Sequence, residues 1–275
     1  MDLQEARKSL YSVVINNNLS KLEEILSKYP DLITVKFNNF DLFHLVILYI
    51  NKYDHDYRIL DLLLKYNMDI NSYHTDGNNE YTPLKRAIFR RDIRLIEYLL
   101  KNGANVNTII GNNELEYSEE NTVMHYILSY CNFSIDNNIL ELLLEYNGDP
   151  NILDKNNCNV LHILLKTLNF PSYKINISSP KVLSLINILL ENGVNFQQKN
   201  ISNHTPLDML KDNNSKNYIS GIINEFINKV KTINYVVEEK NFPNISTDIL
   251  IQIADYLGRK KCLKSLELVN QIKDD

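Results

Sequence analysis

The sequence predicts an all-α solenoid of about six helix-turn-helix repeats, counting its caps, followed by a small helical element. One observation is a short motif whose third position recurs in steps of 41, 40, 37 and 46 residues, at Phe43, Leu84, Met124, Leu161 and Leu207. Another is a leucine-rich stretch at helical spacing after each of the first four motifs, closed by an asparagine-containing loop. Two short helices with one apolar stripe each cannot bury those stripes alone, so neighbouring copies must stack.

The clearest copy runs from Tyr81 to Asn107. We expect Thr82 to cap its first helix through the hydroxyl, followed by a proline at the first helical position, where no N–H partner is lost. The second helix carries its apolar side chains on one face. Gly103 stands where a left-handed residue would end that helix.

This copy resembles an ankyrin repeat, whose pattern is Thr-Pro-Leu-His-x-Ala, a turn, a Leu-Leu helix and Gly-Ala-x-x-Asn. Lys85 departs from it by replacing the histidine, which other copies supply as His44, His125 and His162. The resemblance implies that each such histidine bonds to neighbouring loop backbone and stabilises a projecting finger. One histidine per repeat also leaves the three too far apart to share a metal ion, so we expect no metal, cofactor or catalytic site. A bare unit has about 33 residues, so every copy carries an insertion.

The two ends of the array differ from its middle. Residues 10–33 predict an N-terminal cap of two helices without the motif, as a cap with a solvated outer face allows. The last repeat, from His204 to Val236, begins with Thr-Pro-Leu-Asp and has a polar turn from Asp212 to Ser215, with its second helix expected from Tyr218. We therefore place the solenoid domain at residues 1–237.

Composition limits the possible partners and compartment. A net charge of −5 makes a general nucleic-acid surface unfavourable. The three cysteines are odd in number and lack metal spacing, which is typical of reduced intracellular thiols. The first residues lack the apolar core of a secretory signal, and no later run could span a bilayer. We therefore expect a protein of the cytosol or the nucleus that binds neither nucleic acid nor membranes.

The expected partner surface lies on finger tips and inner helices, which vary freely among repeats of this kind. The third unit has a local charge excess of basic residues, which would either attract an acidic partner or form a solvated helix face. Its finger, from Thr108 to Glu120, is acidic, and long insertions between helices are either partner contacts or tolerated surface loops. The candidate residues for target binding are Tyr73, His74, Asn78, Arg86, Phe89, Arg90, Glu116, Tyr117, Lys155 and Asn156.

A different element begins after the repeats, at residues 238–275. It resembles the start of an F-box, whose pattern is Leu-Pro-x-Glu-Ile with apolar positions four and eight residues beyond that isoleucine. By this resemblance the Skp1-binding residues would be Ile245, Asp248, Ile249, Ile253, Leu257 and Leu263. Ser246 replaces the proline, and only 34 residues remain from Phe242, so the family's last helix would be absent. The alternative is a helical cap that seals the last repeat.

An ankyrin array followed by a truncated F-box is similar to the poxvirus ankyrin/F-box proteins, whose C-terminal element is called the PRANC domain. That resemblance implies a monomeric host-range adaptor in the host cytoplasm, which delivers a host innate-immunity or cell-death protein to the Skp1–cullin-1 ubiquitin ligase. The alternative is a non-degradative binder that blocks a host antiviral factor by occupancy. A cellular regulator or a bacterial effector of the same layout also fits, and an enzyme is the least favoured class because no site motif is present.

Overall fold

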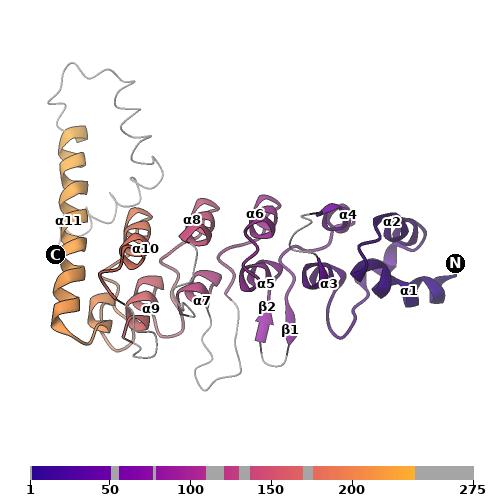
Figure 1. Cartoon of the computed structure of the whole chain (residues 1–275), viewed down its shortest axis with the longest axis horizontal. Helices are drawn as coiled ribbons and strands as arrows, with labels where there is room; N and C mark the ends of the chain where they lie inside the picture. Colours follow the sequence, from indigo (N-terminus) through magenta and orange to yellow (C-terminus); the bar gives the residue numbers. More distant parts are fainter. Residues whose placement is uncertain are drawn as a thin grey trace, which may run out of the picture. The chain divides into compact units, whose positions relative to one another are not determined.

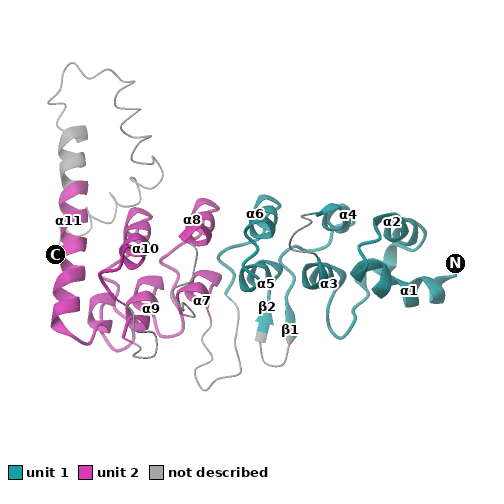
Figure 2. Cartoon of the chain, in the orientation of Figure 1, with its two compact units in different colours: residues 1–120 teal, residues 121–275 magenta. Residues whose placement is uncertain are grey.

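The computed structural model describes residues 2–50, 56–76, 79–109, 121–129, 137–169 and 176–238, with side chains up to residue 230. The chain divides into two compact units, Met1–Glu120 and Asn121–Asp275, which are coloured separately in Figure 2. Each unit is described by itself.

The first unit stacks three helix pairs in two layers. The helices α1, α3 and α5 form one layer through contacts between α1 and α3 and between α3 and α5, while α2 contacts α4 in the other layer. Figure 1 shows the two rows within this unit. Its elements are α1 (Leu3–Ile15), α2 (Leu19–Lys28), the 3-10 helix η1 (Pro30–Thr34), α3 (Leu42–Tyr49), α4 (Arg58–Lys65), β1 (His74–Asp76), β2 (Asn79–Tyr81), α5 (Pro83–Phe89) and α6 (Ile93–Lys101).

The strands β1 and β2 form the finger between the second and third helix pairs. They pair antiparallel with His74 opposite Tyr81 and Asp76 opposite Asn79, so two residues connect them.

The second unit repeats the same arrangement. The helix α7 contacts α9, α8 contacts α10, and η3 contacts both α9 and α11. Its elements are α7 (Val123–Ser129), α8 (Asn137–Glu145), α9 (Val160–Thr167), α10 (Pro180–Glu191), η3 (Pro206–Met209) and α11 (Asn213–Glu238). Together the described parts of the chain contain the six helix pairs that the sequence predicts, with η3 taking the place of an α-helix in the last pair.

Local chemistry explains where the third pair begins and ends. The Thr82 hydroxyl accepts a hydrogen bond from the Lys85 amide at 3.1 Å, and Pro83 occupies the first turn of α5. Gly103, just beyond α6, has φ +94°, a conformation that glycine adopts without steric cost. Both expectations for this repeat are confirmed.

The cores consist of the predicted helix stripes. In α6 the four buried side chains are Leu95, Ile96, Leu99 and Leu100. In α10 the buried aliphatic side chains are Val182, Leu185, Ile186, Ile188, Leu189 and Leu190. Burial of an aliphatic side chain of this size contributes about 1.5–3 kcal/mol, so stacking of adjacent pairs is the main stabilising force.

The start of the last helix was predicted wrongly. Residues 213–215 form the first turn of α11 rather than a loop, because Asp212 caps the helix by accepting from the Ser215 amide at 2.7 Å. An Asp followed by two asparagines is typical of a turn, yet the same side chain is also a strong N-cap. The N-terminal pair of helices is present as expected, but its first helix begins at Leu3, seven residues before the predicted start, because Asp2 caps it by accepting from the Glu5 amide.

Candidate functional site

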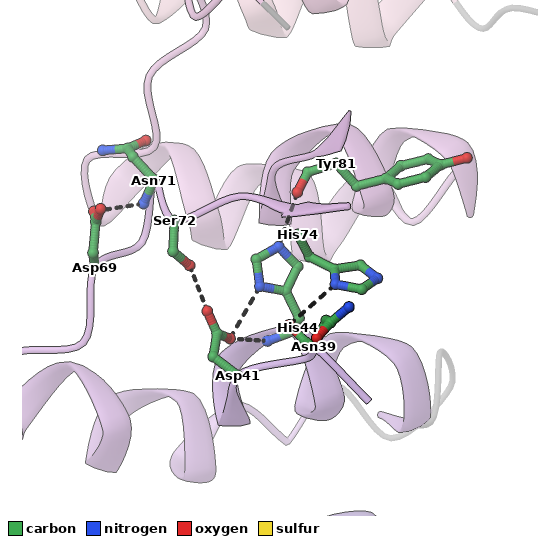
Figure 3. A network of polar contacts seen from close by, with 8 residues as sticks. All are labelled: Asn39, Asp41, His44, Asp69, Asn71, Ser72, His74 and Tyr81. Atoms are coloured by element: carbon green, nitrogen blue, oxygen red, sulfur yellow. Dashed lines mark hydrogen bonds and ion pairs between the residues drawn. The ribbon is translucent and has the colours of Figure 1, made fainter. Parts of the chain in front are cut away.

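The centre of the first unit holds a buried polar network at the start of α3, drawn in Figure 3. Asp41 accepts through Oδ1 from the His44 amide at 2.8 Å and lies 3.0 Å from His44 Nδ1. Its Oδ2 accepts from the Ser72 hydroxyl at 2.8 Å. The other ring nitrogen of His44, Nε2, lies 3.0 Å from the carbonyl oxygen of Tyr81. The network thus ties the start of α3 to the loop after α4 and to the end of β2.

The protonation of this pair follows from its partners. A backbone carbonyl only accepts hydrogen bonds, and an ionised carboxylate does the same. The two ring nitrogens of His44 thus each face an acceptor, Asp41 Oδ1 and the carbonyl oxygen of Tyr81. Burial is the largest single influence on the pKa of Asp41 and would raise it. The interactions with His44 and the hydrogen bond from the Ser72 hydroxyl together outweigh burial and hold that pKa below its ordinary value.

Serine, aspartate and histidine meet here in an order unsuited to nucleophilic catalysis. In a catalytic triad the histidine lies between the serine and the aspartate and removes the hydroxyl proton. Here Asp41 lies between Ser72 and His44, and the imidazole is fully buried. The arrangement orders loops, and the Ser72 hydroxyl bonds the carboxylate of Asp41 rather than the imidazole.

The histidines of the second unit confirm the role that the resemblance implies. His125 Nε2 lies 3.2 Å from the carbonyl oxygen of Cys158, and His162 Nε2 lies 3.1 Å from that of His204. Burial lowers the pKa of His162, which favours a neutral ring. Each histidine therefore bonds backbone about one repeat further along the chain, as His44 does.

Lys85 takes the histidine position in a different way. Its ammonium donates to the carbonyl oxygen of Glu80 at 2.8 Å and lies 5.1 Å from the centroid of the Tyr81 ring. The side chain is buried, and burial lowers its pKa. Lys85 thus braces the finger that precedes its own helix, whereas the histidines reach forward to the next one.

Two asparagines join successive loops within the units. Asn71 donates to the carbonyl oxygen of Gly103 at 3.3 Å and accepts from the Asn105 amide at 2.7 Å. In the second unit Asn151 donates to Gly193 O at 2.8 Å and accepts from the Asn195 amide at 2.6 Å. The same amide side chain in both places satisfies one donor and one acceptor of the next loop.

The guanidinium of Arg90 closes the end of α3. It donates to the carbonyl oxygens of Ile47 and Leu48, and to that of Ile50 at 2.7 Å. These acceptors belong to the last turn and C-cap of α3, where helix carbonyls lack intrahelical partners and a positive charge is favourable. Arg90, expected to contact a target, is therefore already held by three bonds to a neighbouring helix.

His74 and Arg86 lie in an aromatic cluster at the base of the finger. His74 is buried, stacks on Phe40 with ring centroids 3.7 Å apart, and places Nδ1 3.2 Å from the carbonyl oxygen of Asn39. The Arg86 guanidinium carbon lies 4.6 Å from the Tyr81 ring centroid and 5.4 Å from that of Phe40. These two target-binding candidates thus serve the packing of the finger.

The large apolar side chains that remain exposed define a different surface. Phe89, at the end of α5, is 65% exposed, and Tyr49, at the end of α3, is 47% exposed. The hydroxyl of Tyr49 lies 3.1 Å from that of Tyr11 on α1, and their rings meet edge to face. We name Tyr11, Tyr49 and Phe89 the aromatic row, because they come from three consecutive contacting helices of one layer.

The sequence analysis selected only Phe89 from the aromatic row. Tyr49 could have been found by aligning the ends of α3 and α5, because Tyr49 and Phe89 are each the last residue of an inner helix. Tyr11 lies within α1, between the buried Leu10 and Val13, and has no such signal. Tyr73, a finger candidate, is 66% exposed beside β1. Lys155 is exposed and Asn156 half-buried in the second unit, where the Asn156 carbonyl accepts from the Ile201 amide.

The remaining candidates lie outside the described residues. They are Asn78, Glu116 and Tyr117 of the fingers, and Ile245, Asp248, Ile249, Ile253, Leu257 and Leu263 of the F-box-like element. Within the described ranges, no group of three or more His, Cys, Asp or Glu residues could hold a metal ion. No helix in that part of the chain has the length and hydrophobicity to cross a bilayer.

Comparisons with known proteins agree with this geometry. Residues 79–110 match the model of the ankyrin repeat family. The solved ankyrin repeat domain of Bcl-3, a unique member of the IkappaB protein family, superposes with a TM-score of 0.53 at 15% identity, over 77% of this chain and 97% of that one.

A chain from the complex of the predatory endopeptidase Bd0816 of Bdellovibrio bacteriovorus with the immunity protein Bd3460 gives a TM-score of 0.51 at 17% identity, over 81% and 97%. At these identities the likeness shows the fold, which is an all-α ankyrin-repeat solenoid. No curated protein sequence matches the chain.

Proposed function

We propose that the protein is a binding adaptor that captures one protein partner through its ankyrin repeats and brings it to the Skp1–cullin-1 ubiquitin ligase. The observation that supports capture is the aromatic row. The polar side chains of the motif are consumed in bonds between repeats, whereas Tyr49 and Phe89 stay exposed. Exposed tyrosine and phenylalanine on a rigid surface are typical of protein–protein interfaces.

The same features argue against an enzyme. A protein-binding scaffold needs rigid helices and an apolar surface, and both are present in the first unit. The buried His44–Asp41 pair lacks access to a substrate. The comparison proteins support this class, because one is a domain of an IkappaB family member and another comes from a complex of two proteins.

The ligase contact is proposed for the C-terminal element. Its sequence resembles an F-box, and Ile245, Ile249, Ile253, Leu257 and Leu263 would be the apolar anchors on Skp1. Asp248 would lie at the start of the helix, where a negative charge is favourable. The adaptor would act by proximity, since holding a captive beside the ligase raises the effective concentration of its lysines.

The resemblance to poxvirus ankyrin/F-box proteins supports a role in the host cytoplasm against an innate-immunity or cell-death protein. The proposed target-binding side chains are those of the aromatic row, together with Tyr73, Lys155 and Asn156. Asn78, Glu116 and Tyr117 remain candidates from the sequence alone. The free protein would be monomeric.

The test is a pull-down of the purified full chain with recombinant Skp1–cullin-1. The double substitution Ile249→Asp and Leu257→Asp should abolish Skp1 binding, because each places a charge in an apolar contact. Gln252→Asp, between those positions, is the matched control and should bind like the original chain. Retention of Skp1 by the double variant would refute the F-box assignment.

The second candidate function is occupancy without degradation. It is favoured if the full chain binds no Skp1 while a host protein still co-purifies with it in a manner that depends on Phe89. In that case the level of the captured protein in cells should stay constant when the adaptor is expressed. A fall in its level that depends on the proteasome would instead favour the ligase adaptor.

A further inference from the structure

The last described helix has one broad apolar stripe, and only one edge of it is fully covered. Ile219, Ile223 and Val230 of α11 are almost fully buried. Tyr218, Ile222 and Phe226 recur every four residues and form the neighbouring edge of the same stripe. Tyr218 is 39% exposed, and Ile222 and Phe226 are half-buried. This edge is therefore available to a further packed neighbour.

Tyr218, Ile222 and Phe226 form one wall of a groove. The groove has a volume of about 680 Å³ and lies between α10 and α11. Leu183 contributes from α10, and Tyr218, Ile222 and Phe226 from α11, with Gly221 at its floor. A methyl group added at Gly221 would meet nothing within 4 Å, so there is room for close approach of another backbone. The rest of the lining is polar or charged and consists of Asn187, Glu191, Asn217, Glu225 and Lys229.

We propose that this groove is the docking site of the chain's own C-terminal segment, residues 239–275, which packs the stripe Ile245, Ile249, Ile253 and Leu257 against α11. The stripe has the same four-residue spacing as Tyr218, Ile222 and Phe226. Rows of side chains with this spacing on two helices interdigitate in the commonest mode of helix packing. The segment is also adjacent by connection, because it continues directly from α11 at Glu238.

Length and reach fit this occupant. From Asn217 to Lys229 the groove follows twelve residue steps of α11, about 18 Å, and the stripe from Ile245 to Leu257 spans the same twelve steps. The chain must return about 14 Å along α11 from Glu238 to reach Lys229. The seven residue steps from Glu238 to Ile245 reach about 23 Å when extended, which is enough for a turn and the return.

Docking would regulate the C-terminal element. The side chains that fill the groove are the ones assigned to Skp1, so the segment could occupy only one of the two places at a time. The docking follows from the groove and the stripe, whereas its effect on ligase binding rests on the proposed function. A ligand that binds only the released state shifts the equilibrium by its differential affinity.

The chain has no tryptophan, which permits a clean fluorescent reporter. Phe226→Trp in the full chain places the only indole in the groove, and it should emit at short wavelength and resist acrylamide quenching. Adding Ile249→Asp and Ile253→Asp should shift the emission to the red and remove that resistance. Adding Gln252→Asp, on another face of the segment, should leave both unchanged. Far-UV circular dichroism checks that each variant is folded, and Tyr218→Trp is a second reporter.

Three outcomes would overturn the docking. If the stripe substitutions leave the emission wavelength and the acrylamide quenching unchanged, the segment does not cover the groove. An equal shift with Gln252→Asp means that the effect is not specific to the stripe. Protection that is lost on dilution of the parent reporter means that a second copy is the occupant. Skp1 pull-down is therefore done with Ile222→Asp, which disrupts the groove and keeps the stripe intact. Failure of that variant to bind Skp1 rejects the proposed function and leaves the docking test intact.

Discussion

At the scale of single residues, one motif position performs the same task by different chemistry. His125 and His162 bond a later backbone carbonyl, and burial favours the neutral ring of His162. His44 makes the same bond but faces a carboxylate instead of a neutral side chain. The first unit therefore depends on a buried carboxylate whose pKa is lowered, and its stability should depend on acid more steeply than that of the second.

Asp41→Asn tests this carboxylate. Asparagine keeps the size of the side chain but removes the charge, so we expect a loss of about 2 kcal/mol in the free energy of unfolding at neutral pH. The pKa of Asp41 is lowered in the folded chain, so its stabilisation is complete above the unfolded value of about 3.9. It is lost as the pH falls through the folded pKa, below that value.

Urea unfolding followed by circular dichroism between pH 3 and pH 7 measures both effects. The difference between the original chain and Asp41→Asn should shrink towards the acid end. Asp31→Asn, at an exposed position of η1, is the control and should change little. A constant difference across that range would contradict this role of the Asp41 carboxylate.

At the scale of elements, helix ends explain several side chains that sequence alone assigned elsewhere. The last turn of α3 exposes carbonyl groups, and Arg90 from the next inner helix satisfies them. The donor and acceptors are separated by 40 to 43 residues, so no local pattern reveals the contact. The charge excess of the third unit is thus partly structural.

Arg90→Ala should destabilise the chain by about 2 kcal/mol, because three carbonyl groups lose a charged donor. Arg94→Ala, at an exposed position on α6, is the matched control and should stay within about 0.5 kcal/mol of the original. Urea unfolding at neutral pH compares the two variants. Equal stability of both would show that water replaces the guanidinium at no cost.

At the scale of the whole molecule, stacking makes a stable scaffold and leaves side chains for recognition. The repeats bury their helix stripes and use their motif polar groups on each other. In the first unit Tyr49 and Phe89 of the aromatic row stay exposed. Recognition and stability should therefore be separable by substitution.

Phe89→Ala should leave the free energy of unfolding within about 0.5 kcal/mol of the original, because the side chain is mostly solvated. It should weaken capture of the protein partner by about tenfold, as expected when an aromatic anchor is truncated. Ile201→Ala, at a residue 64% exposed in the second unit, is the control for loss of an exposed apolar group. Co-purification from host cells, quantified by mass spectrometry, compares the two, and equal recovery would exclude Phe89 from the interface.

Much of the architecture could be predicted from the sequence because repeats are specified locally. The Thr82 cap, Gly103 at a helix end and the buried stripe of α6 each depend on residues within one or two helical turns. The candidate site was predicted less well. Phe89 and Tyr73 are exposed as expected, whereas His74 and Arg90 are held in contacts within the unit.

The repeat period and the helix pairs could be predicted from the sequence alone, because propensity, capping and apolar spacing act over short distances. The backbone bonds of the histidines followed from the resemblance to ankyrin repeats. The folded structure is needed to see which polar side chains form hydrogen bonds between repeats and which apolar side chains remain exposed. Those outcomes depend on partners 30 to 40 residues away, such as Ser72 for Asp41 and Ile50 for Arg90. A contact that forms only when two repeats stack cannot be predicted from the sequence of either repeat alone.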